Sequence, residues 1–322
     1  MSLEISIVPE KAIAVRRGRE LVTASWFGPT TPRPYVYPFL GPGNVEVTRL
    51  GHPKDLIGHS HHRSIWIGHH DVGGVDFWGE HPRAGRIVQE KAEIVTAKGP
   101  TVAVRLTLSW RAPDGRELLR ESRLLTAIDL LGDELALEIE IELQASSKEP
   151  VSLGVTNFGL LGIRVATTMR VEEGLGGRIL NSQEAENESG CFGQHATWMD
   201  YSGPVPLAAS RDSKPAETGV ASSYPVPATI VGIACFDHPT NAPAAQDAPE
   251  KSGDGETGAE SGGEAMWHVR DDGWMGPSLT RTRARTIRPD APLRVRYRIE
   301  SHAGRPSQAR IDERYRRWRR QG

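Results

Sequence analysis

The sequence has few cysteines and no long apolar run. Among its 322 residues only Cys191 and Cys235 are cysteines, and they form no CxxC pair. This count argues against a disulfide framework and against a cysteine-based zinc or redox site. No segment approaches the roughly eighteen consecutive apolar residues of a membrane span, and the first residues lack the pattern of a secretion signal. We therefore expect a cytoplasmic protein with two reduced thiols.

The sequence also lacks a strong net charge. Lysine and arginine number 39, aspartate and glutamate number 41, and the formal net charge is -2. Without an overall basic field, the protein has no general attraction for phosphate backbones or anionic lipid. A small molecule is therefore the expected partner, nucleic acid and membranes are not, and self-association into a homo-oligomer stays open.

Strict alternation of apolar and polar residues recurs along the chain and predicts an all-β, antiparallel fold. In residues 133–145, DELALEIEIELQA, leucine and isoleucine alternate with glutamate, so one face is apolar and the other acidic. Residues 101–110 alternate in the same way, and the Pro-Asp-Gly turn that follows predicts a long hairpin. In residues 293–301, LRVRYRIES, the arginine face either pairs with a glutamate-bearing strand or remains solvated.

Helix signals are confined to the end of the chain. Ile311, Tyr315 and Trp318 recur at helical spacing, which predicts a terminal helix over about 307–320. Residues from about 240 to 265 are nearly devoid of large apolar side chains and predict a mobile insertion. Because strand-like sequence resumes on both sides of this insertion, we expect residues 1–322 to form a single β-sandwich domain.

Seven of the eleven histidines fall within residues 52–81. If residues 62–72 form a strand, His69 and Asp71 share one face, and the opposite face carries Trp66. An imidazole beside a carboxylate suits a general base or a metal ligand. The same two residues could also form an ordinary hydrogen-bonded pair at the surface, so both interpretations stay open.

A metal site is a second interpretation of the histidines. His59 and His61 are two residues apart and would share a face of an extended segment. Together with His69 they could hold a divalent metal ion with one position open for water or substrate. The HExxH pattern of zinc enzymes is absent from the sequence, so hydrogen bonding to a sugar and acid–base chemistry compete with metal binding.

Two glycines come shortly before Asp76 and Trp78, and such a turn can bring an acid and a large ring to the edge of a pocket. In sugar sites, an aromatic ring covers the C–H face while acids, amides and imidazoles bind the hydroxyls. Burial of Trp78 in the core is the equal alternative. Polar residues in other apolar segments are further candidates, each also explicable as a structural group: Asn157, Arg164, Asn181, Ser182, Asp237, His238, Trp267, His268 and Arg270.

Six segments, taken in order, resemble the PmoA-like family of soluble bacterial proteins: RPYVYPFLGPGNVEVT, HSHHRSIWIGHHDVGGVDFW, GRILNS, WMDYSGPV, FDHPTN and WHVRDDG. The resemblance covers residues from about 33 to about 302. It implies a large antiparallel β sandwich similar to the galactose mutarotase supersandwich, and a connection with sugar catabolism without a settled reaction. The family name refers to a methane-oxidising membrane subunit, whereas this sequence has no expected membrane span.

The chain departs from the family pattern in two places. Members usually carry His-Pro-His-His-Arg-Gly, where this chain has Ser60 and Ser64 in place of proline and glycine and retains the histidines and Arg63. Many members also carry Asp-Thr-Lys-Glu where residues 155–158 are Val-Thr-Asn-Phe. Any chemistry done by those charged residues must be done here by other groups or not at all.

These observations lead to a carbohydrate-active enzyme, a hydrolase, lyase or epimerase that acts on a sugar or an oxidised sugar derivative by His/Asp acid–base chemistry. The expected catalytic residues are His61, His69, Asp71, His238 and His268. The expected substrate-binding residues are Arg63, Trp66, Asp76, Trp78, Asn157, Arg164, Asn181, Trp267 and Arg270. A divalent metal ion on His59, His61 and His69 could assist. The alternatives are a sugar-binding module without turnover and a metal-dependent oxygenase, as the family name suggests.

Overall fold

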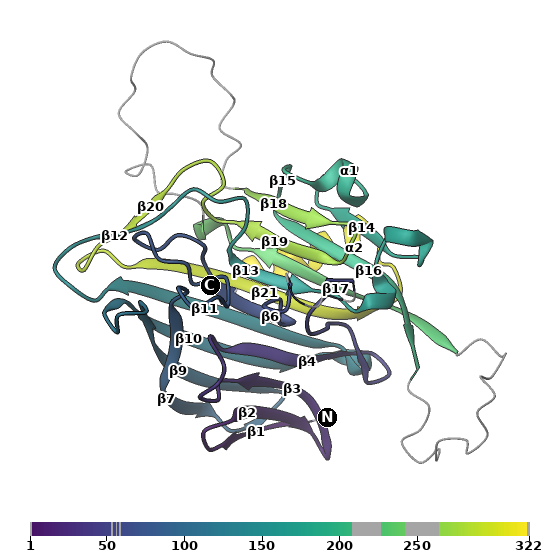
Figure 1. The fold of residues 1–322 in the computed structure, drawn as a ribbon. Helices are drawn as coiled ribbons and strands as arrows, with labels where there is room; N and C mark the ends of the chain where they lie inside the picture. Colours follow the sequence, from purple (N-terminus) through teal and green to yellow (C-terminus); the bar gives the residue numbers. More distant parts are fainter. Residues whose placement is uncertain are drawn as a thin grey trace, which may run out of the picture.

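The structure, a computed structural model, describes residues 2–320 except 53, 56, 58, 208–226 and 242–263. The chain forms an antiparallel β sandwich of two large sheets, which confirms the predicted all-β fold (Figure 1). A two-stranded sheet of β12 (Val151–Leu153) and β20 (Arg285–Ile287) accompanies them. Most of the insertion expected at about 240–265 lies outside the described residues.

The first sheet has eleven strands and brings early and late segments of the chain together. From edge to edge its order is β15 (His195–Ala196), β18 (Ala265–Arg270), β19 (Trp274–Ser278), β13 (Leu160–Arg164), β6 (Ile65–Gly68), β4 (Tyr35–Gly41), β3 (Glu20–Trp26), β2 (Ala12–Arg17), β1 (Leu3–Val8) and β8 (Lys98–Gly99), and β5 (Val45–Glu46) pairs with β4. Figure 1 shows β1 and β2 far from β18 and β19. The strand of the histidine-rich segment, β6, is thus a neighbour of strands from the middle and the end of the chain.

The second sheet has eight strands, in the order β14 (Arg178–Asn181), β16 (Trp198–Pro206), β17 (Ala228–Asp237), β21 (Leu293–Ala303), β11 (Leu135–Ala145), β10 (Glu117–Asp129), β9 (Thr101–Arg111) and β7 (Arg86–Thr96). β9 and β10 form the predicted hairpin. β11 pairs with β21, and Glu138 lies opposite Arg298 with 2.5 Å between Oε1 and Nη1. The arginine face of β21 therefore meets the glutamate-bearing strand β11, which is one of the two alternatives that the sequence left open.

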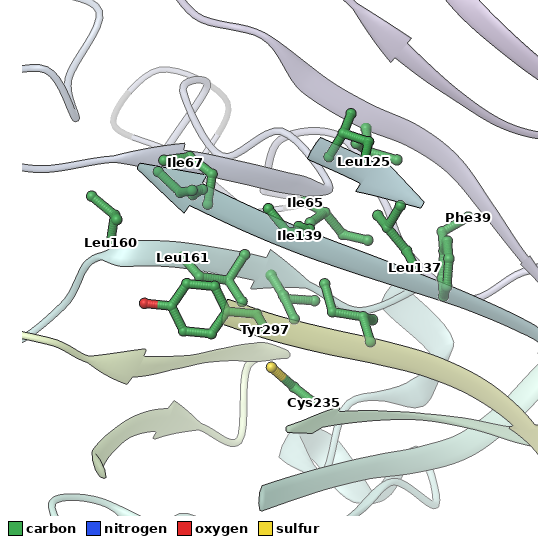
Figure 2. Packing of buried hydrophobic residues seen from close by; sticks show 14 of the residues in the cluster. Phe39, Ile65, Ile67, Leu125, Leu137, Ile139, Leu160, Leu161, Cys235 and Tyr297 are labelled. Atoms are coloured by element: carbon green, nitrogen blue, oxygen red, sulfur yellow. The ribbon is translucent and has the colours of Figure 1, made fainter. Parts of the chain in front are cut away.

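The main core lies between the two sheets. Figure 2 shows Ile65 and Ile67 of β6 and Leu161 of β13 close to Ile139 of β11 and Tyr297 of β21. All five side chains are almost completely buried. Alternation explains this arrangement, because every second residue of a strand points to the same face. The other face of β6 and β13 is consequently directed away from this core.

Two α-helices are described, α1 (Asn187–Cys191) and α2 (Gln308–Arg319). α2 confirms the predicted terminal helix, and the hydroxyl oxygen of Ser307 accepts a hydrogen bond from the Arg310 amide at its start. Its buried residues pack on Trp198 and Phe236 of the eight-stranded sheet. Short 3-10 helices comprise Leu131–Asp133, Thr167–Met169, Glu172–Gly174 and Pro239–Asn241. None of the helices in the described ranges is long and apolar enough to cross a membrane.

Candidate functional site

The candidate site is built on the outer face of four adjacent strands, β6, β13, β19 and β18. Gly162 of β13 lies opposite Trp66 of β6, and Gly276 of β19 lies opposite His268 of β18. These positions alternate with the apolar residues that face the main core. Strand pairing therefore places the histidine-rich segment near His268, about two hundred positions later in the sequence.

Aromatic rings cover this outer face. The ring of Trp66 lies 5.2 Å from that of Trp78 and 5.3 Å from that of Trp274, measured between centroids. Phe158 extends the cluster at 4.9 Å from Trp78. The rings lie close to the sheet because Gly162 has no side chain: a Cβ there would lie 2.7 Å from Trp274 and 2.8 Å from Trp66. We call Trp66, Trp78, Trp274 and Phe158 the aromatic floor.

A pocket of about 590 Å³ opens over the aromatic floor. Its volume falls within the usual range of small-molecule sites, roughly 300–1,000 Å³. We call it the histidine pocket, because five imidazoles contribute to its walls. Its lining residues are His59, His61, His62, His70, Asp76, Trp78, Gly79, Phe158, Arg164, His268, Arg270, Asp272 and Trp274.

Three imidazoles form one contiguous group on the wall that precedes β6. The His61 and His62 ring centroids are 4.3 Å apart, and His59 lies 4.8 Å from His62. His62 also stacks on Trp66 at 5.3 Å, and its Nδ1 accepts a hydrogen bond from Nε of Arg164 at 3.0 Å. Burial and the Arg164 charge hold the pKa of His62 far below its ordinary value, and burial lowers the pKa of His61 to about 4.

His268 closes the pocket from β18. Its ring centroid lies 5.8 Å from Trp274 and 5.2 Å from Phe192. Burial, followed by the charge of Arg270, lowers its pKa to about 4, so the imidazole is neutral at neutral pH. Its Nδ1 is buried and has no hydrogen-bond partner among the described residues. A buried polar atom without a partner is costly, and the nearby backbone of Asn157 partly offsets this cost.

Two carboxylates complete the walls. Oδ1 of Asp76 accepts hydrogen bonds from the amides of Trp78 at 2.7 Å and Gly79 at 3.0 Å, which fixes the turn that carries Trp78. Nδ1 of His70 lies 3.4 Å from the same oxygen, so this exposed imidazole is paired with an acid at the pocket rim. On the opposite side, Oδ1 of Asp272 accepts from Nη1 of Arg164 at 2.6 Å.

The structure places three predicted catalytic residues away from the pocket. His69 is fully buried, with Nε2 2.9 Å from Oγ1 of Thr280, and its Nδ1 accepts from the amide of Asp71. Oδ1 of Asp71 in turn accepts from the Gly74 amide and supports a turn. His238 follows β17 in the other sheet, where its ring lies 5.2 Å from that of Trp318.

The position of His69 follows from alternation. β6 ends at Gly68, and His69 continues the face of Ile65 and Ile67, which is the core face. The opposite face, with Trp66 and His70, is the one that meets the pocket. The apolar character of Ile65 and Ile67 was the sequence signal that could have distinguished the two faces.

The predicted binding residues divide in a similar way. Asp76, Trp78, Arg164 and Arg270 line the histidine pocket together with His59, His61 and His268, and Trp66 belongs to the floor. Asn157 is exposed beside Phe158, and Arg63 lines a neighbouring pocket. Asn181 is buried in β14, where Oδ1 accepts from two backbone amides, and Trp267 faces the main core with Nε1 bonded to a backbone carbonyl.

Several lining residues were not among the predicted site residues: His62, His70, Phe158, Asp272 and Trp274. For His62 and His70 the sequence carried a signal, since both belong to the histidine-rich segment. Asp272 and Trp274 follow the Trp-His-Val-Arg segment, and only the pairing of β18 with β19 shows that they turn back over the same face.

The predicted metal ligands do not come together. His59 and His61 line the histidine pocket, while His69 lies on the core side of the sheet with both ring nitrogens in protein hydrogen bonds or contacts. Within the described ranges, no group of three or more histidine, cysteine, aspartate or glutamate side chains is arranged to hold a metal ion.

Comparison with known proteins gives a family but no activity. The sequence model of a family of unknown function (DUF6807) matches residues 12–316. No curated protein matches the chain. Among solved structures, a protein described as a putative mutarotase (YeaD) from Salmonella typhimurium matches with a TM-score of 0.33 and 12% identity, over 94% of each chain. A similarity this distant carries no argument about the reaction.

Proposed function

The chain belongs to the DUF6807 family of unknown function, and we propose from its pocket that it is a carbohydrate-active enzyme. It would act on a sugar or an oxidised sugar derivative as a hydrolase, lyase or epimerase. One observation supports this most: histidines from both ends of the chain share a pocket with an aromatic floor. The earlier resemblance to PmoA-like proteins, with its link to sugar catabolism, points to the same class of substrate.

The pocket has the two kinds of surface that a sugar ring needs. Phe158 is partly exposed and offers an apolar face for the C–H groups of the ring, with the buried Trp78 packed against it. Around them, imidazoles, Asp76 and Arg270 can donate to or accept from hydroxyl groups. Arg270 is about half exposed, with Nε 3.1 Å from Glu188, so it can also turn to a carboxylate of an oxidised sugar.

The imidazoles supply acid–base chemistry. His61 and His268 are neutral at neutral pH, because burial lowers the pKa of each to about 4, and each neutral imidazole can accept a hydrogen bond from a hydroxyl group or act on it as a weak base. His70 beside Asp76 would return a proton at the rim of the pocket. The proposal makes no use of His69 or His238.

The test is a screen of purified protein against glycosides, sugars and their oxidised and keto forms, followed by optical rotation and NMR. His268→Ala should lower turnover of any substrate found by roughly a hundredfold or more. His195→Ala is the matched control, because His195 is exposed on β15 and does not line the pocket. Equal turnover of the two variants would contradict the proposal.

The same screen separates the two alternatives. A sugar-binding module would bind ligands without converting them, and His268→Ala would change the affinity only a few fold. A metal-dependent oxygenase would require redox iron or copper, which elemental analysis of protein purified without a histidine tag would detect. Stoichiometric redox metal together with oxygen consumption would replace our proposal.

A further inference from the structure

A second pocket adjoins the histidine pocket. It has a volume of about 400 Å³ and is lined by Arg49, Leu50, Gly51, His52, Ser60, Arg63 and Thr167. We call it the Arg49 pocket. Its lining contains two arginines, an imidazole and two hydroxyl groups, and no carboxylate among the described residues. This composition differs from that of the histidine pocket, whose two arginines are accompanied by two aspartates.

Arg49 carries a buried charge without an acidic partner of its own. Its side chain is only 7% exposed, and its guanidinium donates to the carbonyl oxygens of Gly51, Val165 and Asp272. No carboxylate lies within 4.0 Å of it in the described part of the chain. The nearby carboxylate of Asp272 is engaged by Arg164 at 2.6 Å.

The other arginine of the pocket is already neutralised. Arg63 forms a bidentate pair with Glu80, with Nε to Oε1 at 2.9 Å and Nη2 to Oε2 at 2.8 Å. The excess positive charge of the Arg49 pocket therefore belongs to Arg49. A guanidinium has five N–H donors, and the three bonds of Arg49 to carbonyls leave two. A buried cation beside a cavity is stabilised by an anion, which recovers part of its desolvation cost.

Two neighbouring imidazoles, His52 and His59, stand between the two pockets. His52 lines the Arg49 pocket and His59 lines the histidine pocket, and their ring centroids are 5.3 Å apart. Nε2 of His52 also lies 3.4 Å from Oδ2 of Asp272, which lines the histidine pocket. A ligand that occupies both pockets would extend past these two imidazoles.

We propose that the Arg49 pocket binds an anionic group of the ligand, a carboxylate or a phosphate, while the remainder of the ligand lies in the histidine pocket. Arg49 provides the charge, and the hydroxyl of Thr167 provides a further hydrogen-bond donor, whereas the Ser60 hydroxyl already donates to the carbonyl of Ile57. The placement of the remainder of the ligand in the histidine pocket rests on the proposed function. Anion binding by the Arg49 pocket does not rest on it, so the anion site and the proposed function can fail separately.

The test measures binding of inorganic phosphate, gluconate and glucose by isothermal titration calorimetry and NMR. Thr167→Glu places a carboxylate in the Arg49 pocket and should weaken phosphate and gluconate at least tenfold relative to Thr167→Gln, which adds the same bulk without charge. Thr107→Glu makes the same chemical change on the exposed side of β9 and should bind both anions as the wild type does. Thermal unfolding of each variant verifies that it is folded.

The outcomes are distinct. If neither anion binds the wild type saturably, or if Thr167→Glu and Thr167→Gln bind both anions equally, the inference is overturned. Phosphate binding without gluconate binding assigns the pocket to phosphate esters, and the reverse assigns it to sugar acids. If the anions bind and respond to Thr167→Glu but no sugar binds or turns over, the anion site stands and the proposed function fails.

Discussion

The aromatic floor should be sensitive to a single added methyl group at Gly162. In Gly162→Ala the new Cβ would lie 2.7 Å from Cη2 of Trp274 and 2.8 Å from Cζ2 of Trp66. Carbon atoms are most favourably separated by about 3.5–4.0 Å, so the indoles must move by about 1 Å. Both rings are almost completely buried and packed against each other, which leaves them little room. Overpacking of this kind costs about 1–3 kcal/mol of unfolding free energy.

Gly232→Ala is a matched control in the other sheet. A Cβ at Gly232 would collide with the ring of His302, so this variant is also overpacked, but it lies in β17 and away from the histidine pocket. Urea unfolding should show destabilisation of both variants. Near-UV circular dichroism and the indole N–H resonances of Trp66 and Trp274 should change only in Gly162→Ala. Unchanged stability and unchanged indole signals in Gly162→Ala would refute the packing argument.

Three further predictions concern the supports of the fold and of the site. Trp318→Ala should lower the unfolding free energy by about 3–5 kcal/mol, because this ring is only 2% exposed where it packs on the eight-stranded sheet. Urea unfolding measures the loss, and ligand binding in the histidine pocket should be unchanged. Burial lowers the pKa of His302, but Asp200 at 2.6 Å raises it more, so the net pKa is raised. The His302–Asp200 pair therefore stabilises the fold fully below pH 6.5, and this contribution is lost as the pH rises through the raised pKa of His302. The difference in unfolding free energy between wild type and His302→Gln should accordingly shrink above pH 6.5. Arg33→Met removes the donors to the carbonyl oxygens of His61 and of Gly79 in a neighbouring turn, and it should lower the unfolding free energy by roughly 3 kcal/mol. Amide hydrogen exchange around His61 should become faster, and unchanged exchange would contradict this role of Arg33.

Much of the fold could be predicted from local patterns. Alternation identified the strands around residues 101–110, 133–145 and 293–301, and helical spacing identified α2. Alternation could not decide whether the arginine face of β21 remained solvated or paired with another strand. Charge patterns show only that the arginine face and the glutamate face are complementary. The pairing of β11 with β21 decided this point.

The candidate site was predicted less completely. The histidine-rich segment does contribute to the pocket, and His268 joins it from β18. The sequence predicts that His69 and Asp71 share a face, but alternation alone does not say which face is covered by the second sheet. Trp274 gave no local signal of its place in the site, because it reaches the floor only through the pairing of β19 with β13 and β18.

The chain by itself determined which residues share a strand face, since side chains alternate with a period of two wherever the backbone is extended. Only the tertiary structure decided which strands are neighbours. The order β6, β13, β19, β18 depends on long-range pairing and on burial of one face against the eight-stranded sheet. That burial left the face with Trp66, Gly162 and His268 outward, and it made one pocket from residues about two hundred positions apart.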